Sequence, residues 1–183
     1  MRVITGTLRG KKLKTLESLD TRPTTDMVKE AIFSVIQFDV PGCRCIDLFA
    51  GSGQMGIEAL SRGASFCAFI DLNPSAVEII KENVNACGLG GVSKVFNCDS
   101  LDYLRTESRN TDIIFMDPPY GKGLLEKALP LCDRLINAGG IVVCEHEKEL
   151  LLDDSYGRLR LHKRYKYGKI AVTVFRVPED DEG

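Results

Sequence analysis

The sequence has 183 residues, of which 44% are hydrophobic and 27% charged, and its 24 basic and 26 acidic residues give a net charge of -2. This composition describes one globular domain over residues 1–183 and excludes a disordered, collagen-like or disulfide-rich chain. No apolar run approaches the roughly 20 residues that cross a bilayer, and the first residues lack the apolar stretch of a signal peptide. We therefore expect a cytoplasmic protein with no membrane segment, monomeric by default.

Residues 1–42 are expected to form a small extension ahead of the main sheet. Segments 2–6 and 8–13 are predicted to pair as a hairpin. A helix is then predicted to begin near Thr24 or Thr25, where a hydroxyl group can cap it. Its expected buried stripe consists of Val28, Ala31, Ile32, Val35 and Ile36.

From residue 43 to residue 183, short apolar segments alternate with longer helical ones, a pattern typical of a parallel sheet covered by helices. Strands are predicted at 45–49, 66–71, 92–98, 112–116 and 141–145. Helices are predicted at 55–62, 74–86, 101–104 and 124–136. Two final strands, 158–165 and 169–177, are predicted to pair antiparallel. The sequence therefore predicts an α/β fold: a Rossmann-like, seven-stranded, mostly parallel sheet with a C-terminal antiparallel hairpin and a small N-terminal hairpin and helix extension.

The seven cysteines are odd in number, include no Cys-x-x-Cys pair and lie mostly in apolar segments. We expect them to be reduced and to pack as small hydrophobic side chains. His146 and His162 are each isolated, without a partner at the spacing that a metal site needs. The sequence therefore predicts no metal site.

The basic residues are concentrated towards the two ends of the sequence. Residues 1–14 hold five and residues 157–177 hold seven, and neither segment contains an acid, whereas the rest of the chain carries 12 basic and 26 acidic residues. If the two ends meet in the fold, they form one basic face that attracts a polyanion. The alternative is that both are solvated edges of the sheet, because edge strands commonly carry lysine against aggregation.

A glycine-rich segment follows the first predicted strand of the alternating part. It formally matches G-x-G-x-x-G at Gly51, Gly53 and Gly56, and Asp71 ends the next strand, where a ribose-binding acid belongs. A nicotinamide dinucleotide and S-adenosylmethionine both fit this geometry. Asp47 favours the second, because its carboxylate would repel a pyrophosphate and suit an ammonium group. A tight strand-to-helix turn without a ligand stays open as the structural alternative.

Asp117, Pro118, Pro119 and Tyr120 end a strand of apolar residues and therefore lie at the carboxyl edge of the sheet, where ligands bind in open α/β folds. The two prolines remove two backbone donors, so that carbonyl oxygens there can face a pocket beside the Asp117 carboxylate. Such acceptors can hold the two N–H groups of a conjugated amine and stabilise the positive charge that develops on its nitrogen. Tyr120 offers a flat face on which a base can stack.

These segments resemble known families. DLFAGSG at 47–53 is similar to motif I of the S-adenosylmethionine-dependent methyltransferases, and DPPY at 117–120 is similar to their motif IV for exocyclic amines. Four longer segments resemble the RsmD-type 16S ribosomal RNA guanine-N2 methyltransferases: RVITGTLRGKKL at 2–13, TRPTTDMVKEAIF at 21–33, DLFAGSGQMGIEALSRGA at 47–64 and YGKIAVTVFR at 167–176. The likeness spans almost the whole chain in the same order, although Gln54 and Met55 stand where many relatives have smaller or simpler residues.

The resemblance implies a role for each site residue. Asp71 would bind the ribose hydroxyls and residues 99–100 would lie beside the adenine. The implied cofactor-binding set is Asp47, Phe49, Gly51, Gly53, Asp71, Leu72, Asp99 and Ser100. The implied catalytic set, which holds the target amine, is Asp117, Pro118, Pro119 and Tyr120. The residues expected to grip RNA phosphates are Arg2, Arg9, Lys11, Lys12, Arg22, Lys29, Arg164 and Lys166.

The expected reaction is in-line transfer of a methyl group from S-adenosylmethionine to the N2 amine of a guanine in 16S ribosomal RNA. We expect the assembled small subunit as the substrate, because the part of the chain before residue 45 offers a small surface for reading bases. Amino-methylation of DNA adenine or cytosine is an alternative, but only 63 residues follow Tyr120 and leave little room for a DNA-reading module. Protein glutamine methyltransferases carry asparagine in place of Asp117. A non-catalytic RNA-binding adaptor and a dinucleotide oxidoreductase are the remaining alternatives.

Overall fold

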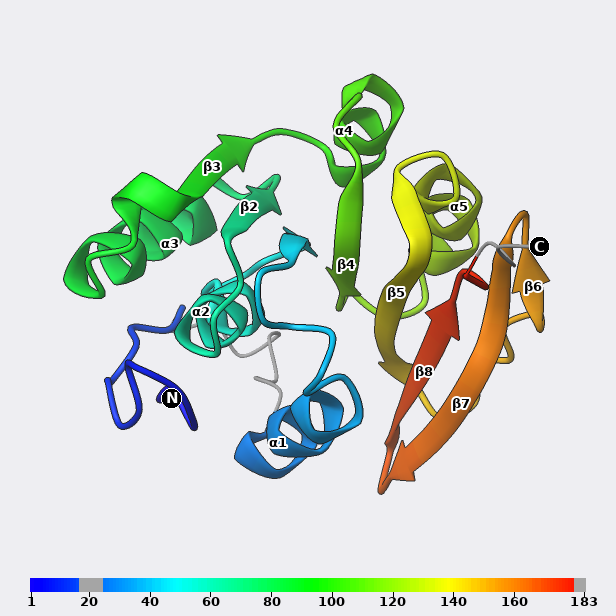
Figure 1. Ribbon diagram of the computed structural model, residues 1–183, viewed down its shortest axis with the longest axis horizontal. Helices are drawn as coiled ribbons and strands as arrows, with labels where there is room; N and C mark the ends of the chain where they lie inside the picture. The colour runs from blue at the N-terminus through cyan, green and yellow to red at the C-terminus, as the bar shows by residue number, and fades with distance from the viewer. Residues whose placement is uncertain (17–24, 180–183) are drawn as a thin grey trace.

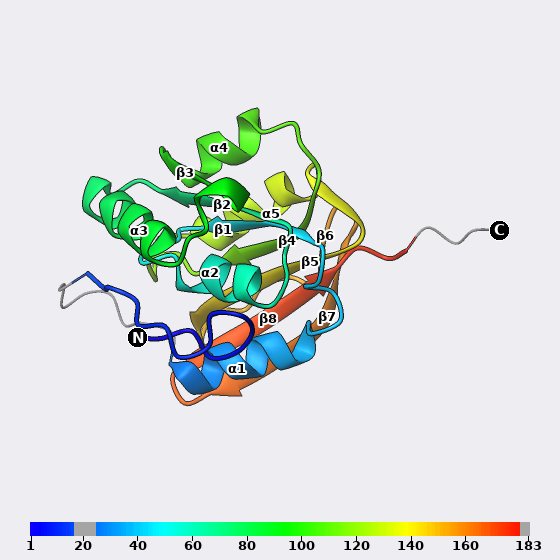
Figure 2. The ribbon, with the colours of Figure 1, turned by 60° about the vertical axis from the view of Figure 1, so that its left-hand side comes forward.

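The computed structural model describes residues 1–16 and 25–179. In these residues eight strands form one sheet in the order β3-β2-β1-β4-β5-β8-β7-β6, with helices on both faces (Figures 1 and 2). Five neighbouring strands run parallel: β1 (Arg44–Leu48), β2 (Phe66–Asp71), β3 (Ser93–Asn97), β4 (Thr111–Met116) and β5 (Ile136–Glu147). The others pair antiparallel: β6 (Ser155–Tyr156), β7 (Leu159–Tyr167) and β8 (Ile170–Arg176).

This architecture confirms the predicted α/β fold, with its mostly parallel sheet and C-terminal antiparallel hairpin. The predicted number of seven strands is wrong by one. The additional strand, β6, has two residues, Ser155 and Tyr156, which pair with Arg160 and Leu159 of β7. Two residues are too few to show an alternating pattern, so sequence periodicity could not reveal this strand.

The described residues contain five α-helices: α1 (Asp26–Val35), α2 (Gln54–Ser61), α3 (Pro74–Ala86), α4 (Ser100–Thr106) and α5 (Leu124–Cys132). A short 3₁₀ helix, η1, covers Gly90–Val92. The expected cap of α1 is confirmed, since Thr25 Oγ1 accepts a hydrogen bond from the Val28 amide at 3.3 Å. Helices α1, α2 and α3 contribute to one hydrophobic core, and α4 and α5 to a second one on the other face of the sheet.

The boundary between α5 and β5 differs from the prediction. The helix was expected to continue to residue 136, but it ends at Cys132, shortly after Pro130. The chain then makes a tight turn, in which the Leu135 amide donates to the Cys132 carbonyl at 2.9 Å, and the Leu135 carbonyl accepts the Thr111 amide at the start of β4 at 2.9 Å. Strand β5 begins at Ile136, and its pairing with β4 is irregular around Gly139, which has a φ of 73°. This irregular half of the strand lacks a regular pattern, so only its second half was predicted.

The first 16 residues, here called the N-terminal segment, pair antiparallel as predicted, but over a shorter stretch. The Val3 amide donates to the Lys11 carbonyl and the Gly10 amide to the Val3 carbonyl, both at 2.9 Å, and the Leu13 amide donates to the Met1 carbonyl at 3.0 Å. In the part of the chain that the structure describes, the segment makes one isolated β-bridge, between Arg2 and Lys12. The amides of Ile4 and Thr5 turn away from it and donate to the Glu58 carboxylate of α2. The segment is therefore held both by a short pairing with itself and by a helix of the core.

The buried face of α1 is also wider than predicted. The expected stripe is buried at Val28, Ile32 and Ile36 and half-buried at Ala31 and Val35. Two further side chains, Lys29 and Phe33, are completely buried. The prediction that Lys29 grips RNA phosphates is therefore wrong, because its side chain presents no surface to solvent.

All seven cysteines are free thiols, as expected, and six of them are buried. Cys43, Cys45 and Cys67 share one core cluster. Burial contributes to raising the pKa of each of these three thiols, which keeps them protonated and unreactive.

Candidate active site

The loop between β1 and α2 has a backbone that few residues adopt. Phe49, Gly51 and Gly53 have φ values of 63°, 58° and 79°. The loop is tied to β2 because the Ala50 amide donates to the Ile70 carbonyl at 2.9 Å. Gly53 then precedes the first turn of α2. The predicted strand, glycine turn and helix are therefore present, with two of the three glycines in the left-handed region.

Asp71 ends β2 and holds the loop from the side. Its Oδ2 accepts a hydrogen bond from the Gly51 amide at 2.8 Å, and its Oδ1 accepts one from the Asn73 amide at 2.8 Å. The next side chain, Leu72, is 64% exposed. Asn97, at the end of β3, donates to the carbonyls of both Asp71 and Leu72. The carboxylate and the exposed apolar side chain thus lie together at the carboxyl edge of the sheet. Asn97, which the sequence analysis missed, supports them.

Asp47 lies near the end of β1 and is almost completely buried. Its Oδ2 accepts a hydrogen bond from the Gly56 amide in the first turn of α2 at 2.9 Å. Burial raises the pKa of Asp47 to about 8; the Gly56 amide opposes this rise and the nearby charge of Asp71 adds to it. This carboxyl group joins the strand to the helix that follows the loop.

Gly56 allows α2 to approach β2 closely. A Cβ atom at this position would lie 2.3 Å from the Phe69 ring and 2.6 Å from the Cys67 sulfur. Any larger residue would push the helix away from the sheet. The third glycine of the motif therefore serves packing rather than backbone conformation, since its φ is not in the left-handed region.

Asp99 follows β3 and caps α4. Its Oδ1 accepts hydrogen bonds from the amides of Leu101 and Asp102 at 2.8 and 3.0 Å. The adjacent Ser100 is buried. Both residues follow the carboxyl end of β3, the strand next to β2.

Residues 117–120 follow β4 directly. Pro118 is buried, whereas Tyr120 is 47% exposed. Pro118, Pro119 and Tyr120 border a pocket of about 220 Å³, which is also lined by Gly121, His146, Glu147 and Leu150. The Glu147 carboxylate, at the end of β5, accepts a hydrogen bond from the Gly121 amide at 3.1 Å. Sequence reasoning missed Glu147, although its place at the end of a strand next to β4 was a usable signal.

Both ring nitrogens of His146, a residue of β5, lie within hydrogen-bond distance of protein oxygens. Its Nδ1 lies 2.8 Å from the Glu147 carbonyl and its Nε2 lies 2.8 Å from the Thr173 hydroxyl. A carbonyl oxygen can only accept, so Nδ1 carries the hydrogen and Nε2 accepts from Thr173. Burial lowers the pKa of His146, and the ring is neutral and fully bonded.

The site collects acids at one edge of the sheet. Strands β1 to β5 are parallel, so the residues that end or follow them meet at this edge: Asp47, Asp71, Asp99, Asp117 and Glu147. Burial keeps Asp47 protonated, and the other acids at this edge suit a cofactor that carries an ammonium and a sulfonium group and would repel a pyrophosphate. The residues present therefore fit S-adenosylmethionine. In the described residues, no group of three or more His, Cys, Asp or Glu side chains could hold a metal ion.

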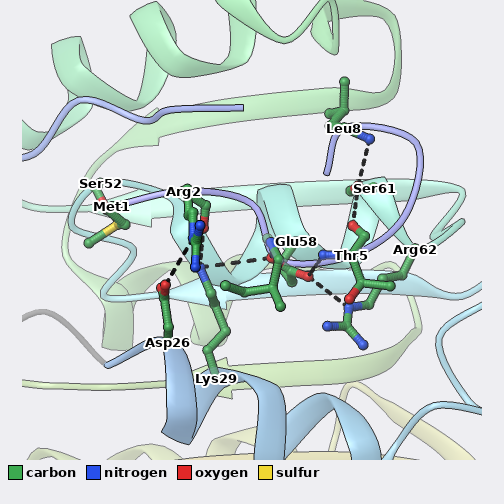
Figure 3. Close-up of polar contacts among 12 residues, drawn as sticks. Met1, Arg2, Thr5, Leu8, Asp26, Lys29, Ser52, Glu58, Ser61 and Arg62 are labelled. Carbon is green, nitrogen blue, oxygen red and sulfur yellow. Dashed lines mark hydrogen bonds and ion pairs between the residues drawn. The ribbon is translucent and has the colours of Figure 1, made fainter. Parts of the chain in front are cut away.

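The N-terminal segment is anchored on α2 by a buried carboxylate (Figure 3). Glu58 accepts the Ile4 amide at 2.8 Å, the Thr5 amide at 3.0 Å and Arg62 Nε at 2.8 Å. Lys29 Nζ lies 3.8 Å from the same carboxylate and donates to the Arg2 carbonyl at 2.6 Å. Lys29 therefore has a structural role as a cation of the core. Burial lowers its pKa, although Glu58 opposes this effect.

A serine one turn further along α2 completes the anchor. Ser61 Oγ donates to the Thr5 carbonyl at 2.6 Å and accepts the Leu8 amide at 3.0 Å. Between them, Gly6 has a φ of 87°, and a Cβ there would lie 1.9 Å from the Ser61 carbonyl oxygen. The segment therefore fits against α2 only with glycine at this position.

The other residues expected to bind RNA have mixed positions. Arg2, Arg9, Lys11 and Lys12 are exposed on the N-terminal segment, and Arg164 and Lys166 are exposed on β7. Arg22 lies outside the described residues. Helix α1 separates the N-terminal segment from the tip of the β7–β8 hairpin (Figure 1). In this view the two basic stretches lie on either side of α1.

The fold and the site define the class. A Rossmann-like sheet with a glycine loop, an acid after β2 and the sequence DPPY after β4 describes an S-adenosylmethionine-dependent methyltransferase. A solved structure, that of the Escherichia coli protein yhhF, superposes with a TM-score of 0.88 at 30% identity and covers 98% of this chain and 99% of that one. Among the helices of the described residues, none is long and apolar enough to span a membrane.

Sequence comparison leads to the family. A family model described as conserved hypothetical protein 95 matches residues 1–176. YlbH of Bacillus subtilis (strain 168) is 39% identical over 96% of this chain and 98% of its own length. Ribosomal RNA small subunit methyltransferase D of Escherichia coli (strain K12) is 30% identical over 96% of this chain and 89% of its own length. The chain belongs to this family, that of the RsmD-type rRNA methyltransferases.

The raised pKa of Asp47 gives a testable dependence of stability on pH. The folded protein holds this proton up to about pH 8, whereas the unfolded chain releases it near 3.8. Within this range the native state binds more protons, so the free energy of unfolding falls as the pH rises, by at most about 1.4 kcal/mol per pH unit. Asp47→Asn should flatten this part of the profile in urea denaturation between pH 5 and 8. Parallel profiles for the two proteins would contradict the buried, neutral carboxyl group.

Proposed function

We propose that this chain transfers a methyl group from S-adenosylmethionine to the N2 amine of a guanine in small-subunit ribosomal RNA, with the assembled subunit as its substrate. The observation that carries the proposal is the placement of residues 117–120 after β4. Pro118, Pro119 and Tyr120 border a pocket of about 220 Å³, and all four residues lie at the same edge of the sheet as Asp71 and the glycine loop. The name of the Escherichia coli relative supports the class of RNA.

The exocyclic amine of guanine is a poor nucleophile, because its lone pair is delocalised into the ring. The site must therefore make the lone pair of this nitrogen available for the reaction. The Asp117 carboxylate and the Pro118 carbonyl would accept the two N–H groups and hold the nitrogen as it becomes pyramidal. The same oxygens stabilise the positive charge that develops there. S-adenosylmethionine supplies an electrophilic methyl group on its sulfonium. The proton released from nitrogen passes to Asp117 or to water.

Tyr120 would position the base. Its ring is about half exposed beside the pocket, and aromatic side chains commonly stack on bases that leave a helix or loop. A guanine in structured RNA must be turned out before it reaches this pocket. Fixing the base and the methyl donor in one geometry supplies much of the rate.

The exposed basic side chains would grip the RNA backbone. Those on the N-terminal segment lie on one side of α1, and those on β7 lie on the other side. Phosphate contacts of this kind give an affinity that falls steeply with salt and carries little sequence information. An assembled subunit, whose shape fixes the target, therefore suits this protein better than naked RNA, and its place of action would be the cytoplasm.

The proposal is tested by transfer of labelled methyl groups from S-adenosylmethionine. The acceptors are small ribosomal subunits, naked 16S RNA, duplex DNA and a release-factor protein, followed by nucleoside analysis of the labelled product. We expect N2-methylguanosine in the subunits and much less in naked RNA.

Each other result has a distinct meaning. Equal labelling of naked RNA would overturn the preference for the assembled subunit. Label in adenine or cytosine of DNA, or in glutamine of the protein, would agree with an S-adenosylmethionine-dependent methyltransferase but would contradict ribosomal RNA as its substrate. Binding of a nicotinamide cofactor instead of S-adenosylmethionine, or of neither, would overturn the reaction itself.

A further inference from the structure

Asn83 is a buried amide on α3 that faces the N-terminal segment. Its side chain is 2% exposed. Its Oδ1 accepts the Lys14 amide at 2.8 Å, and its Nδ2 donates to the Lys14 carbonyl at 3.0 Å. The side chain thus pairs with both backbone groups of one residue, as the backbone of a neighbouring strand would. Asparagine lowers the stability of a helix interior, so its place here is explained by these tertiary bonds.

The same side-chain amide also forms a hydrogen bond with the loop between β1 and α2. Its Nδ2 donates to the Ser52 carbonyl at 2.9 Å. Ser52 is the central residue between Gly51 and Gly53, whose conformations define the loop. Its hydroxyl group donates to the Met1 sulfur at 3.3 Å (Figure 3). The loop is therefore connected to the N-terminal segment twice, once directly and once through Asn83.

We propose that Asn83 is a positioning residue that couples binding of the cofactor to binding of the RNA. The identities of these two ligands rest on the proposed function. A ligand on the loop restricts Ser52, and the planar amide passes this restriction to Lys14, because one rigid group bonds to both. Three exposed cations, Arg9, Lys11 and Lys12, lie two to five residues before Lys14 in the chain. A bound cofactor therefore strengthens the binding of RNA to these cations by a certain factor. By linkage, bound RNA strengthens the binding of the cofactor by the same factor.

The test measures this factor. The affinity for small ribosomal subunits is determined with and without S-adenosylhomocysteine in the wild type, in Asn83→Ala and in Asn85→Ala. Asn85 is an exposed residue on the same helix and provides the matched control. We expect the analogue to tighten subunit binding about fivefold or more in the wild type and in Asn85→Ala. In Asn83→Ala the factor should fall to about one.

Hydrogen exchange at the Lys14 amide gives a second readout that a purely structural role of Asn83 would not affect. The analogue should slow this exchange in the wild type and leave it unchanged in Asn83→Ala.

If Asn83→Ala does not fold, Lys14→Pro tests the other end of the contact. It removes the amide hydrogen that Asn83 accepts, whereas Lys14→Ala retains it and loses the same side chain. The factor by which S-adenosylhomocysteine tightens subunit binding should fall in Lys14→Pro and persist in Lys14→Ala.

A factor of about one in the wild type, or a factor that survives in a folded Asn83→Ala protein, would overturn the coupling while leaving the proposed function intact. Failure of the wild type to bind the analogue at all would overturn the proposed function and the coupling together.

Discussion

Replacing Asp117 with alanine is expected to lower kcat for methyl transfer by a factor of about 10² to 10³, the usual effect of removing one preorganised group that stabilises transition-state charge. The loss should fall on kcat, because the developing charge on the amine nitrogen is present only in the transition state. Binding of S-adenosylhomocysteine should change less than about threefold, since the loop, Asp71 and Asp99 are untouched.

The matched control is Asp153→Ala. Asp153 is an exposed aspartate away from the residues that line the pocket. Single-turnover assays with labelled cofactor separate the chemical step from binding. A variant at position 117 that retains a third or more of the wild-type rate would remove this carboxylate from the mechanism. If the Asp117→Ala variant lost only affinity for the cofactor, Asp117 would be a cofactor-binding residue and not a residue that holds the target amine.

Replacing Glu58 with alanine is expected to lower the free energy of unfolding by about 3–5 kcal/mol, the range for breaking a buried ion pair from one side. The carboxylate is completely buried and is shared by Lys29, Arg62 and the amides of Ile4 and Thr5. Its removal leaves the Lys29 ammonium in the core without a counter-charge and two backbone donors without their acceptor. Both effects raise the energy of the folded state only.

Glu82→Ala is the matched control for this prediction. Glu82 also lies on a helix and pairs with a lysine of the N-terminal segment, Lys14, at 2.7 Å, but both side chains are at least half exposed. Surface pairs contribute about 0–1 kcal/mol, so urea denaturation should separate the two variants clearly. A loss at position 58 no larger than the loss at position 82 would show that the buried cluster adds no stability.

The carboxyl edge of the sheet was predictable because its signals are local. An apolar run of four or five residues followed by Asp71 or Asp117 marks a buried parallel strand and the acid at its end. The glycines mark the loop, and Asn73 marks the cap of α3. Each signal depends only on neighbours in the sequence, and the structure retains each of them.

The N-terminal anchor was not predictable in the same way. Lys29 was assigned to the surface because of its charge, but Glu58 neutralises it from a position 29 residues further along the chain. The spacing of Lys29, Phe33 and Ile36 does match one helix face, and this was the usable signal. Asn83 gave no such signal, because an asparagine in a helix is usually exposed and its partners at Lys14 and Ser52 are backbone atoms.

Phe49 has a consequence for how the cofactor is bound. A non-glycine residue with a φ of 63° carries strain of about 1–2 kcal/mol, and the bonds from Ala50 to Ile70 and from Gly51 to Asp71 hold it in place. The first half of the loop, residues 49–51, is thus preorganised: folding of the sheet, and not arrival of the ligand, fixes its shape. Binding need not order these three residues, so they add little entropic cost to it, and the ligand acts on the part of the loop that begins at Ser52.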